Sequence, residues 1–290
     1  MVGRCFALSA NSAWSAFWRN QPVGAAGCLA GAPEAVAKAL RAAWEEFARN
    51  LPRSAAVLDI ATGDGAVPRI MARRRTDLRI DAVDQAEIPP RAGPVKLTGC
   101  VDAAALPFAD QMFAGVTSQF GIEYCGPTAL IEAVRVLAPG GHLRFVCHHE
   151  ASEAVRHNRA RLAALRAMSE AGLFAAARRA CAGLPADALA QARIARIMTL
   201  HASQGIVREL PGALAQVIGR PGGLAAVATI EARSVEEDLR ITAMLDAALA
   251  RDAAQTMTER LAALGLAVRC DTLTVQGRPF AWLIDGALPG

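Results

Sequence analysis

Hydrophobic and polar residues follow two different patterns along the chain. Between residues 52 and 149, short apolar runs without alternation, such as residues 55–60, are separated by segments with helical periodicity. Apolar runs of this kind predict strands that are buried on both faces. From about residue 150 to residue 264 the strand pattern gives way to an Ala-, Leu- and Arg-rich helical pattern. The pattern therefore predicts an α/β protein with a large helical insert.

The expected strands alternate with helices along the first part of the chain. We expect strands at residues 55–60, 79–84, 95–100, 113–120 and 142–147. We expect helices at about residues 34–49, at residues 128–138, and from the turn after residue 65 to about residue 75. Strands at residues 266–275 and 279–284, joined by Gln276-Gly277, predict a terminal hairpin. Ser234 with Glu237 predicts a capping box that starts the last helix. Alternating strands and helices indicate right-handed βαβ units in a doubly wound parallel sheet.

Chain length and pattern together predict the domain organisation. A chain of 290 residues suggests about two domains. Here we expect one domain over residues 34–149 and 255–290, interrupted by a helical insert at 150–254 that serves as a substrate cap or a dimerisation element. Residues 1–33 form an N-terminal helical segment, in which Trp14, Phe17 and Trp18 share one helical face.

Composition and charge narrow the class of protein. Hydrophobic residues make up 53% and charged residues 20%, which excludes a disordered chain. The net charge of +4 is too small for a dedicated nucleic-acid-binding protein. The seven cysteines are odd in number, scattered and never in C-x-x-C spacing, so we expect neither disulfides nor structural zinc. With no apolar run of about 18 residues and no signal-peptide pattern, we expect a soluble cytoplasmic protein.

Candidate chemistry begins in the stretch V-L-D-I-A-T-G-D-G-A at residues 57–66. Asp59 lies near the end of a buried strand and is followed by a glycine-bearing loop that enters a helix. Such a loop lets a ligand approach the backbone, and the helix start offers free N–H donors. Asp84 ends the next strand, where a carboxylate can accept hydrogen bonds from ribose hydroxyls. An ordinary turn and a solvated strand-end aspartate are the alternative interpretations.

Four motifs together carry a family resemblance. They are Asp59 with Gly63 and Gly65, Asp84, Asp102-Ala103, and the turn Pro139-Gly140-Gly141. With them, the chain resembles the class I S-adenosylmethionine-dependent methyltransferases over residues 34–149 and 255–287. Residues 120–123 and 134–141 are similar to the ubiquinone/menaquinone-biosynthesis branch. The resemblance implies a seven-stranded, mostly parallel sheet with an antiparallel terminal strand. Ala61 stands where the family has its first loop glycine.

The resemblance also implies a cofactor, S-adenosylmethionine, and the residues that hold it. These residues are Asp59, Ala61, Gly63, Gly65, Asp84, Gln85, Asp102, Ala103, Gln119 and Phe120. Asp59 contacts the methionine amino group and the glycine loop lies under the methionine moiety. Asp84 holds the ribose, Asp102 and Ala103 hold the adenine, and Gln119 with Phe120 line the methionine and substrate side.

Catalytic candidates lie just past the expected fifth strand. His148 and His149 are candidate general bases, and because neighbours on an extended segment point in opposite directions, at most one faces the cleft. Glu123 and Tyr124 come next. The cluster of Trp14, Phe17 and Trp18 is either a lid over cofactor or substrate or a simple docking surface for the first helix. No H-E-x-x-H spacing is present, so we expect no metal site.

These candidates favour methyl transfer to a small organic acceptor. Residues 118–121 read S-Q-F-G where enzymes that methylate nucleobase amino groups carry N/D-P-P-Y/F, and the Pro-Cys dipeptide of cytosine C5 methylation does not occur. Two alternatives stay open at this point: an NAD-dependent oxidoreductase on a Rossmann sheet, and a non-catalytic methyltransferase-like binding protein. The loop lacks the third glycine of G-x-G-x-x-G, which weighs against the oxidoreductase. We expect no nucleic-acid partner and no membrane span, with a homodimer as an alternative use of the insert.

Overall fold

The computed structural model describes residues 10–20, 32–88 and 95–290. These residues form two compact units. A sheet unit comprises residues 14–155 and 246–290, and a helical unit comprises residues 156–245 with the first residues of the first helix, up to Ala13. The sequence predicts the insert at residues 150–254, whereas residues 150–155 and 246–254 belong to the sheet unit.

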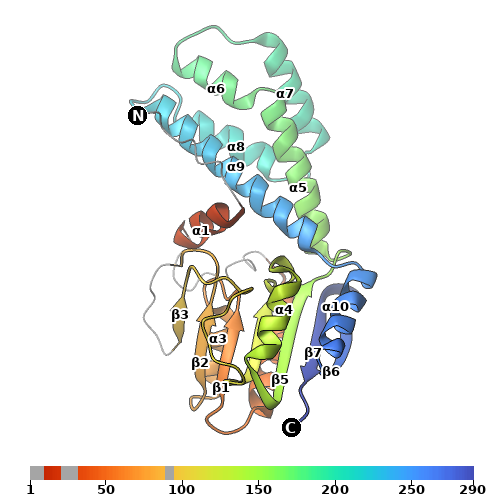
Figure 1. The fold of residues 1–290 in the computed structure, drawn as a ribbon. Coiled ribbons are helices and arrows are strands. Elements are labelled where there is room, and N and C mark those ends of the chain that lie inside the picture. The colour runs from red at the N-terminus through yellow and green to blue at the C-terminus, as the bar shows by residue number, and fades with distance from the viewer. Residues whose placement is uncertain (1–9, 21–31, 89–94) are drawn as a thin grey trace. The chain divides into compact units, whose positions relative to one another are not determined.

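The sheet unit is built on one twisted sheet. Within the described residues it has seven strands, in the order β3-β2-β1-β4-β5-β7-β6 (Figure 1). The strands are β1 Ala56–Ile60, β2 Arg79–Val83, β3 Lys96–Thr98, β4 Phe113–Gln119, β5 Leu137–His148, β6 Ala267–Val275 and β7 Arg278–Ala287. Strands β1 to β5 pair in parallel, and β7 runs antiparallel between β5 and β6. The predicted fold class is confirmed.

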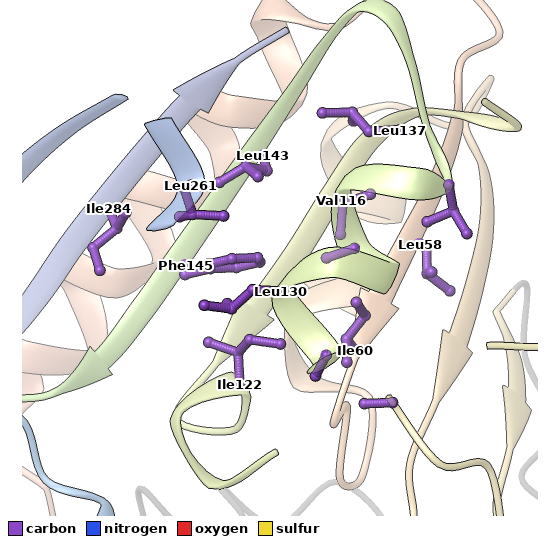
Figure 2. Close-up of a cluster of buried hydrophobic side chains, with 14 of the residues drawn as sticks. Leu58, Ile60, Val116, Ile122, Leu130, Leu137, Leu143, Phe145, Leu261 and Ile284 are labelled. Atoms are coloured by element: carbon purple, nitrogen blue, oxygen red, sulfur yellow. The ribbon is translucent and has the colours of Figure 1, made fainter. Parts of the chain in front are cut away.

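Helices cover both faces of this sheet. α2 (Glu34–Asn50) and α3 (Ala66–Arg74) lie on one face, and α4 (Gly126–Arg135) and α10 (Arg251–Ala263) lie on the other (Figure 1). α2 turns Leu40, Trp44 and Phe47 inward at helical spacing. Figure 2 shows the core beneath α4 and α10, where Leu130 and Leu261 pack over the strands. Because helices cover both faces of the central strands, a ligand is expected at the ends of these strands.

The chain order creates a switch point in the sheet. From β1 the chain moves outward through β2 and β3, then returns to place β4 on the other side of β1. The carboxyl ends of β1 and β4 therefore lie side by side, with connections that leave in opposite directions. In doubly wound sheets, ligands bind at such a point.

The helical unit has its own core. It is formed by α5 (Glu153–Glu170), α6 (Leu173–Cys181), α7 (Ala188–Leu200), α8 (Ile206–Ala215) and α9 (Gly223–Ala247). Ion pairs join α5 to α9, with Arg161 bound to Glu237 and Arg166 to Asp238. No described helix is both long and apolar enough to cross a membrane.

Three sequence-based boundaries were wrong. Ser234 lies inside α9, where its hydroxyl donates to the carbonyl of Ile230, because an apolar stripe continues through this point and keeps the helix intact. The last helix instead begins at Arg251. The predicted helix 128–138 begins at Gly126 and ends at Arg135, and the Pro-Gly-Gly turn is absorbed into the start of β5. Gly140 permits this with a φ of +71°.

Candidate functional site

The loop after β1 is built from left-handed backbone conformations. Ala61, Gly63 and Gly65 have φ values of +52°, +56° and +81°. Glycine adopts these freely, whereas a residue with a side chain pays about 1–2 kcal/mol. In the family that the chain resembles, this position is usually a glycine. Ala61 adopts the conformation that a glycine would adopt there. The loop ends at Gly65, which precedes α3 and leaves the first N–H groups of that helix open.

Asp59 is a buried carboxyl group beneath this loop. It is 1% exposed, and the hydroxyl of Thr117 on β4 donates to its Oδ1 at 2.6 Å. Burial raises the pKa of Asp59 to about 7, although hydrogen bonds from Thr117 and Thr62 oppose the rise. Its carboxyl group is thus balanced between the neutral and charged forms at neutral pH. A cationic ligand group beside it would favour the charged form.

Asp84 connects the loop to the end of β2. Its Oδ2 accepts a hydrogen bond from the N–H of Gly63 and its Oδ1 accepts one from the N–H of Ala86, both at 2.8 Å. Burial raises its pKa, and these two hydrogen bonds oppose the rise. Each oxygen keeps a lone pair for a further donor. Gln85 beside it is exposed.

The remaining predicted cofactor residues lie around the same strand ends. The N–H of Val101 donates to the carbonyl of Asp84, which brings the segment with Asp102 and Ala103 next to β2. Asp102 is exposed and accepts from the N–H of Ala104, whereas Ala103 is buried. Gln119 ends β4, where its side-chain oxygen accepts from the indole N–H of Trp44 at 2.7 Å. That hydrogen bond fixes the side chain of Gln119 toward α2, a contact that the sequence did not predict.

Gly121 brings the segments after β1 and β4 into close contact. A Cβ atom on Gly121 would lie 2.5 Å from the Cβ of Ala61, so only glycine fits there. Phe120, just before it, has a φ of +54° and donates its N–H to the carbonyl of Val146. The strand ends of β1, β4 and β5 are thereby held together.

The first helix, α1 (Ala10–Asn20), places aromatic rings over this loop. The indole of Trp18 lies against Gly63, where an added Cβ would come within 2.4 Å of the ring. The hydroxyl of Ser15 accepts from the N–H of Glu87, and Arg19 pairs with the Glu87 carboxylate at 2.9 Å. The ring of Trp14 lies 5.6 Å from that of Phe17. The structure thus brings the predicted aromatic cluster to the glycine loop.

His148 lies at the end of β5 in a polar and aromatic setting. Its Nδ1 is 2.8 Å from Oε1 of Glu123, whose side chain is fully buried. The ring of Phe120 lies 4.4 Å from the imidazole, and the ring of Tyr124 lies 6.0 Å away. Tyr124 in turn meets Trp14 at 6.2 Å. His148 and Glu123 are therefore continuous with the aromatic cluster of α1.

His149 faces the other way. Its ring stacks on Trp282 of β7 at 4.4 Å, and its Nδ1 accepts from the N–H of Ala151 at 3.1 Å. Partial burial lowers the pKa of His149. The two histidines thus point apart, as expected on a strand. Of the two candidate bases, the geometry favours His148.

Several residues of the site carry no sequence signal that could have identified them. Thr117 and Trp44 reach the site through pairings across the sheet or between a helix and the sheet. Within the described part of the chain, no group of three or more His, Cys, Asp or Glu side chains is arranged to hold a metal ion.

Comparisons with known proteins point to one class of domain. Residues 58–145 match the family model described as a methyltransferase domain. A 2-phytyl-1,4-naphtoquinone methyltransferase from Thermosynechococcus vestitus is 34% identical over 113 residues, which are 34% of this chain and 49% of that protein. The match thus spans about half the length of this curated relative.

Solved structures with similar folds are distant in sequence. A putative S-adenosyl-L-methionine-dependent methyltransferase from Methanococcus maripaludis has a TM-score of 0.47 and 10% identity, with coverage of 100% of this chain and 98% of that one. A putative methyltransferase solved with the Haloferax volcanii Trm112 activator has a TM-score of 0.45 and 13% identity, with coverage of 90% and 96%.

Proposed function

We propose that this chain, which carries a class I S-adenosylmethionine-dependent methyltransferase domain, transfers a methyl group from S-adenosylmethionine to a small organic acceptor. The observation that carries the proposal is a left-handed glycine loop between two carboxyl groups, that of buried Asp59 and that of half-buried Asp84. This pair lies at the switch point of the sheet, where a nucleoside ligand is expected.

The residues present fit the proposed cofactor. Asp59 is buried, holds a hydrogen bond from one hydroxyl and has a pKa raised to about 7, so a cationic amino group would be a strong partner for it. Asp84 offers two carboxylate oxygens that suit ribose hydroxyls. The cofactor, when bound, supplies a methyl group on a positively charged sulfur that is already activated for transfer.

The other residues of the site complete this assignment. Gly63 and Gly65 would lie under the methionine moiety together with Ala61, and Gln85 would border the ribose. Asp102 and the backbone N–H of Ala103 would hold the adenine, while Gln119 and Phe120 would line the methionine side. Most of the rate in such a reaction comes from holding an in-line nucleophile with water excluded. These residues therefore act mainly by orientation.

The first helix would serve as the lid of this site. Trp18 already covers Gly63, and Trp14 and Phe17 extend the apolar surface toward Tyr124. This supports a lid over cofactor and acceptor, in preference to simple docking of the helix. The role of the helical unit as a substrate cap or a dimerisation element stays a prediction.

The acceptor is proposed to be a small, largely apolar organic molecule. Aromatic side chains next to His148 favour such a compound, and the curated relative is named for a naphthoquinone substrate. No observation favours an NAD-dependent oxidoreductase, because the loop lacks the third glycine of that fingerprint. A non-catalytic binding protein would bind S-adenosylmethionine without transferring its methyl group.

Calorimetry with S-adenosylmethionine and with NAD tests the proposal. We expect the first to bind and the second not to bind. Asp84→Ala should weaken S-adenosylmethionine binding about 100-fold, since hydrogen bonds to a charged group contribute about 1.5–3 kcal/mol. Asp271→Ala, on an exposed part of β6, is the matched control and should bind as the wild type does. Unchanged affinity in Asp84→Ala would remove the ribose assignment, and NAD binding alone would overturn the proposed function.

A further inference from the structure

We propose that Glu123 positions His148 as a general base, that the acceptor is consequently an aromatic ring with a hydroxyl group, and that the oxygen of this group is methylated. This inference deepens the proposed function and rests on it. Glu123 is the positioning residue, and His148 is the group that touches the acceptor.

The hydrogen bonds of Glu123 determine which imidazole nitrogen is available. Its Oε1 accepts from the backbone N–H of His148 at 2.9 Å and lies 2.8 Å from Nδ1 of the same residue. An ionised carboxylate can only accept, so Nδ1 must carry the proton and donate it. Nε2 is then left with a free lone pair. Backbone and side chain of His148 are thus held by one oxygen atom, which fixes both the tautomer and the direction of the ring.

The burial of Glu123 is expensive for the fold alone. Its side chain is fully buried, and its second oxygen, Oε2, accepts from no N–H or O–H group and has only the thiol of Cys147 near the carboxylate as a weak donor. A buried polar atom without a partner costs about 1–3 kcal/mol, and more when it is charged. A glutamine at this position would satisfy the same backbone N–H at lower cost. A carboxylate with an unsatisfied oxygen is therefore better explained by its effect on His148 than by packing.

The neighbouring thiols do not compete with His148 for this role. Burial raises the pKa of Cys147 well above its usual value, and the adjacent Glu123 charge raises it further. Cys125 behaves in the same way, with a pKa of about 12. Both thiols stay protonated near neutral pH and are poor nucleophiles and poor bases. His148 is left as the group next to Glu123 that can take up a proton.

The surroundings of His148 indicate the acceptor class. Phe120 lies against the imidazole and Tyr124 meets it edge-on, while Trp14 extends the same aromatic surface. The imidazole itself remains 13% exposed. Flat aromatic side chains favour a flat apolar partner, through offset or edge-to-face contacts. A base beside this aromatic surface favours an acceptor that carries a weakly acidic hydroxyl group.

The proposed step balances as a proton transfer and a displacement. The acceptor oxygen forms a bond to the methyl carbon while its proton moves to Nε2 of His148. The bond between sulfur and the methyl carbon breaks, and its electron pair remains on sulfur. The proton then leaves Nε2 for water, so no oxidant or further reactant is required. The nitrogen of aniline and the ring carbon of indole do not lose a proton before they attack, and would not need this base.

The tautomer of His148 can be measured without cofactor or acceptor. Long-range proton–nitrogen spectra of protein with ¹⁵N-labelled histidine, with peaks assigned through His148→Gln, distinguish a protonated Nδ1 from a protonated Nε2. His149 is an internal reference with the opposite expectation, because its Nδ1 accepts from Ala151 and its proton must lie on Nε2. We expect a protonated Nδ1 in His148 of the wild type, and a mixture of tautomers in Glu123→Ala, which leaves no side-chain acceptor at Nδ1. A protonated Nε2 in the wild type, or no change in Glu123→Ala, would overturn the positioning role.

Methylation assays test the acceptor class. We expect transfer to catechol or 1-naphthol, and none to aniline or indole. Glu123→Gln should lower kcat about 100-fold with little change in the KM for S-adenosylmethionine. Glu132→Gln is the matched control: Glu132 also accepts a backbone N–H, from Leu106, but lies on α4 and pairs with Arg135. It should lower stability and leave kcat and the His148 tautomer unchanged.

The outcomes separate this inference from the proposed function. Failure of the wild type to bind S-adenosylmethionine overturns the proposed function and, with it, the acceptor class. Cofactor binding combined with methylation of only aniline or indole, or of none of the four compounds, overturns the acceptor class and leaves the cofactor assignment intact.

Discussion

Asp59→Asn is expected to have opposite effects on the fold, which it should stabilise, and on cofactor binding, which it should weaken. The carboxyl group is buried beneath the glycine loop, and burial raises its pKa from 3.8 to about 7. An amide has nearly the same shape and its oxygen can still accept from Thr117. It carries no charge at any pH, so it avoids the cost of placing a buried anion in the folded protein.

The magnitude follows from linkage between protonation and folding. Between pH 3.8 and about 7 the unfolded chain has released the Asp59 proton while the folded protein still holds it. The folded state binds more protons in this window, so stability falls as pH rises through it. The loss is complete above the folded pKa. A difference of about 3 pH units corresponds to about 4 kcal/mol.

Chemical denaturation at about pH 5 and about pH 9 measures this effect. We expect the stability advantage of Asp59→Asn over the wild type to grow from about 1.5 kcal/mol at the lower pH to about 4 kcal/mol at the higher pH. Asp271→Asn, at an exposed position, should change stability by no more than about 0.5 kcal/mol at either pH. The same Asp59→Asn protein should bind S-adenosylmethionine weakly, because it offers no charge to an amino group.

A lower stability of Asp59→Asn at high pH would refute the reasoning, since it would mean that the anion is well stabilised in the folded state. A gain that does not depend on pH would also refute it, because the effect would then come from packing.

Three further predictions concern the lid, the sheet and the thiols. Trp18→Ala should raise the dissociation constant for S-adenosylmethionine about tenfold, measured by calorimetry, and should increase amide hydrogen exchange around Gly63. If neither quantity changes, α1 is a docked helix and not a lid. Arg144→Met should lower the free energy of unfolding, measured by urea denaturation, by about 3 kcal/mol, because buried Arg144 binds Asp285 and Glu46. A loss of no more than about 1 kcal/mol, as for an ion pair on the surface, would contradict this. Exposed Cys100 should react with iodoacetamide in the folded protein before Cys125, whose pKa is about 12; mass mapping checks the order, and early labelling of Cys125 would contradict it.

Local sequence patterns were sufficient to predict the framework of the sheet unit. Short apolar runs identify β1 and β4 because a strand covered by helices on both faces has no polar face to display. The hairpin of β6 and β7 follows from its Gln-Gly turn, where both residues have positive φ. The acids at the ends of β1 and β2 could be identified because their roles depend on strand ends, which are local features.

The contacts that specify the site were not predictable in this way. Glu123 and His148 are 25 positions apart, and Trp44 and Gln119 are 75 apart, so each pairing depends on the register of the sheet. A sequence pattern names candidate groups but not their partners. The error at Ser234 has the same origin, because a capping box competes with tertiary packing and here the apolar stripe of α9 prevails.

Unfavourable features of the sheet unit gather at one edge. Ala61 and Phe120 adopt left-handed backbone conformations, Asp59 is a buried acid with a raised pKa, and Glu123 has a buried oxygen without an N–H or O–H donor. All four lie at the carboxyl ends of β1, β4 and their continuations, next to the switch point. Simple replacements by glycine, asparagine or glutamine would relieve each of them. A sequence selected for stability alone would not concentrate these unfavourable features at the place where a cofactor and an acceptor can meet. A binding site gains from them, because each leaves a group that is held in a fixed direction and has incomplete hydrogen bonding until a ligand binds.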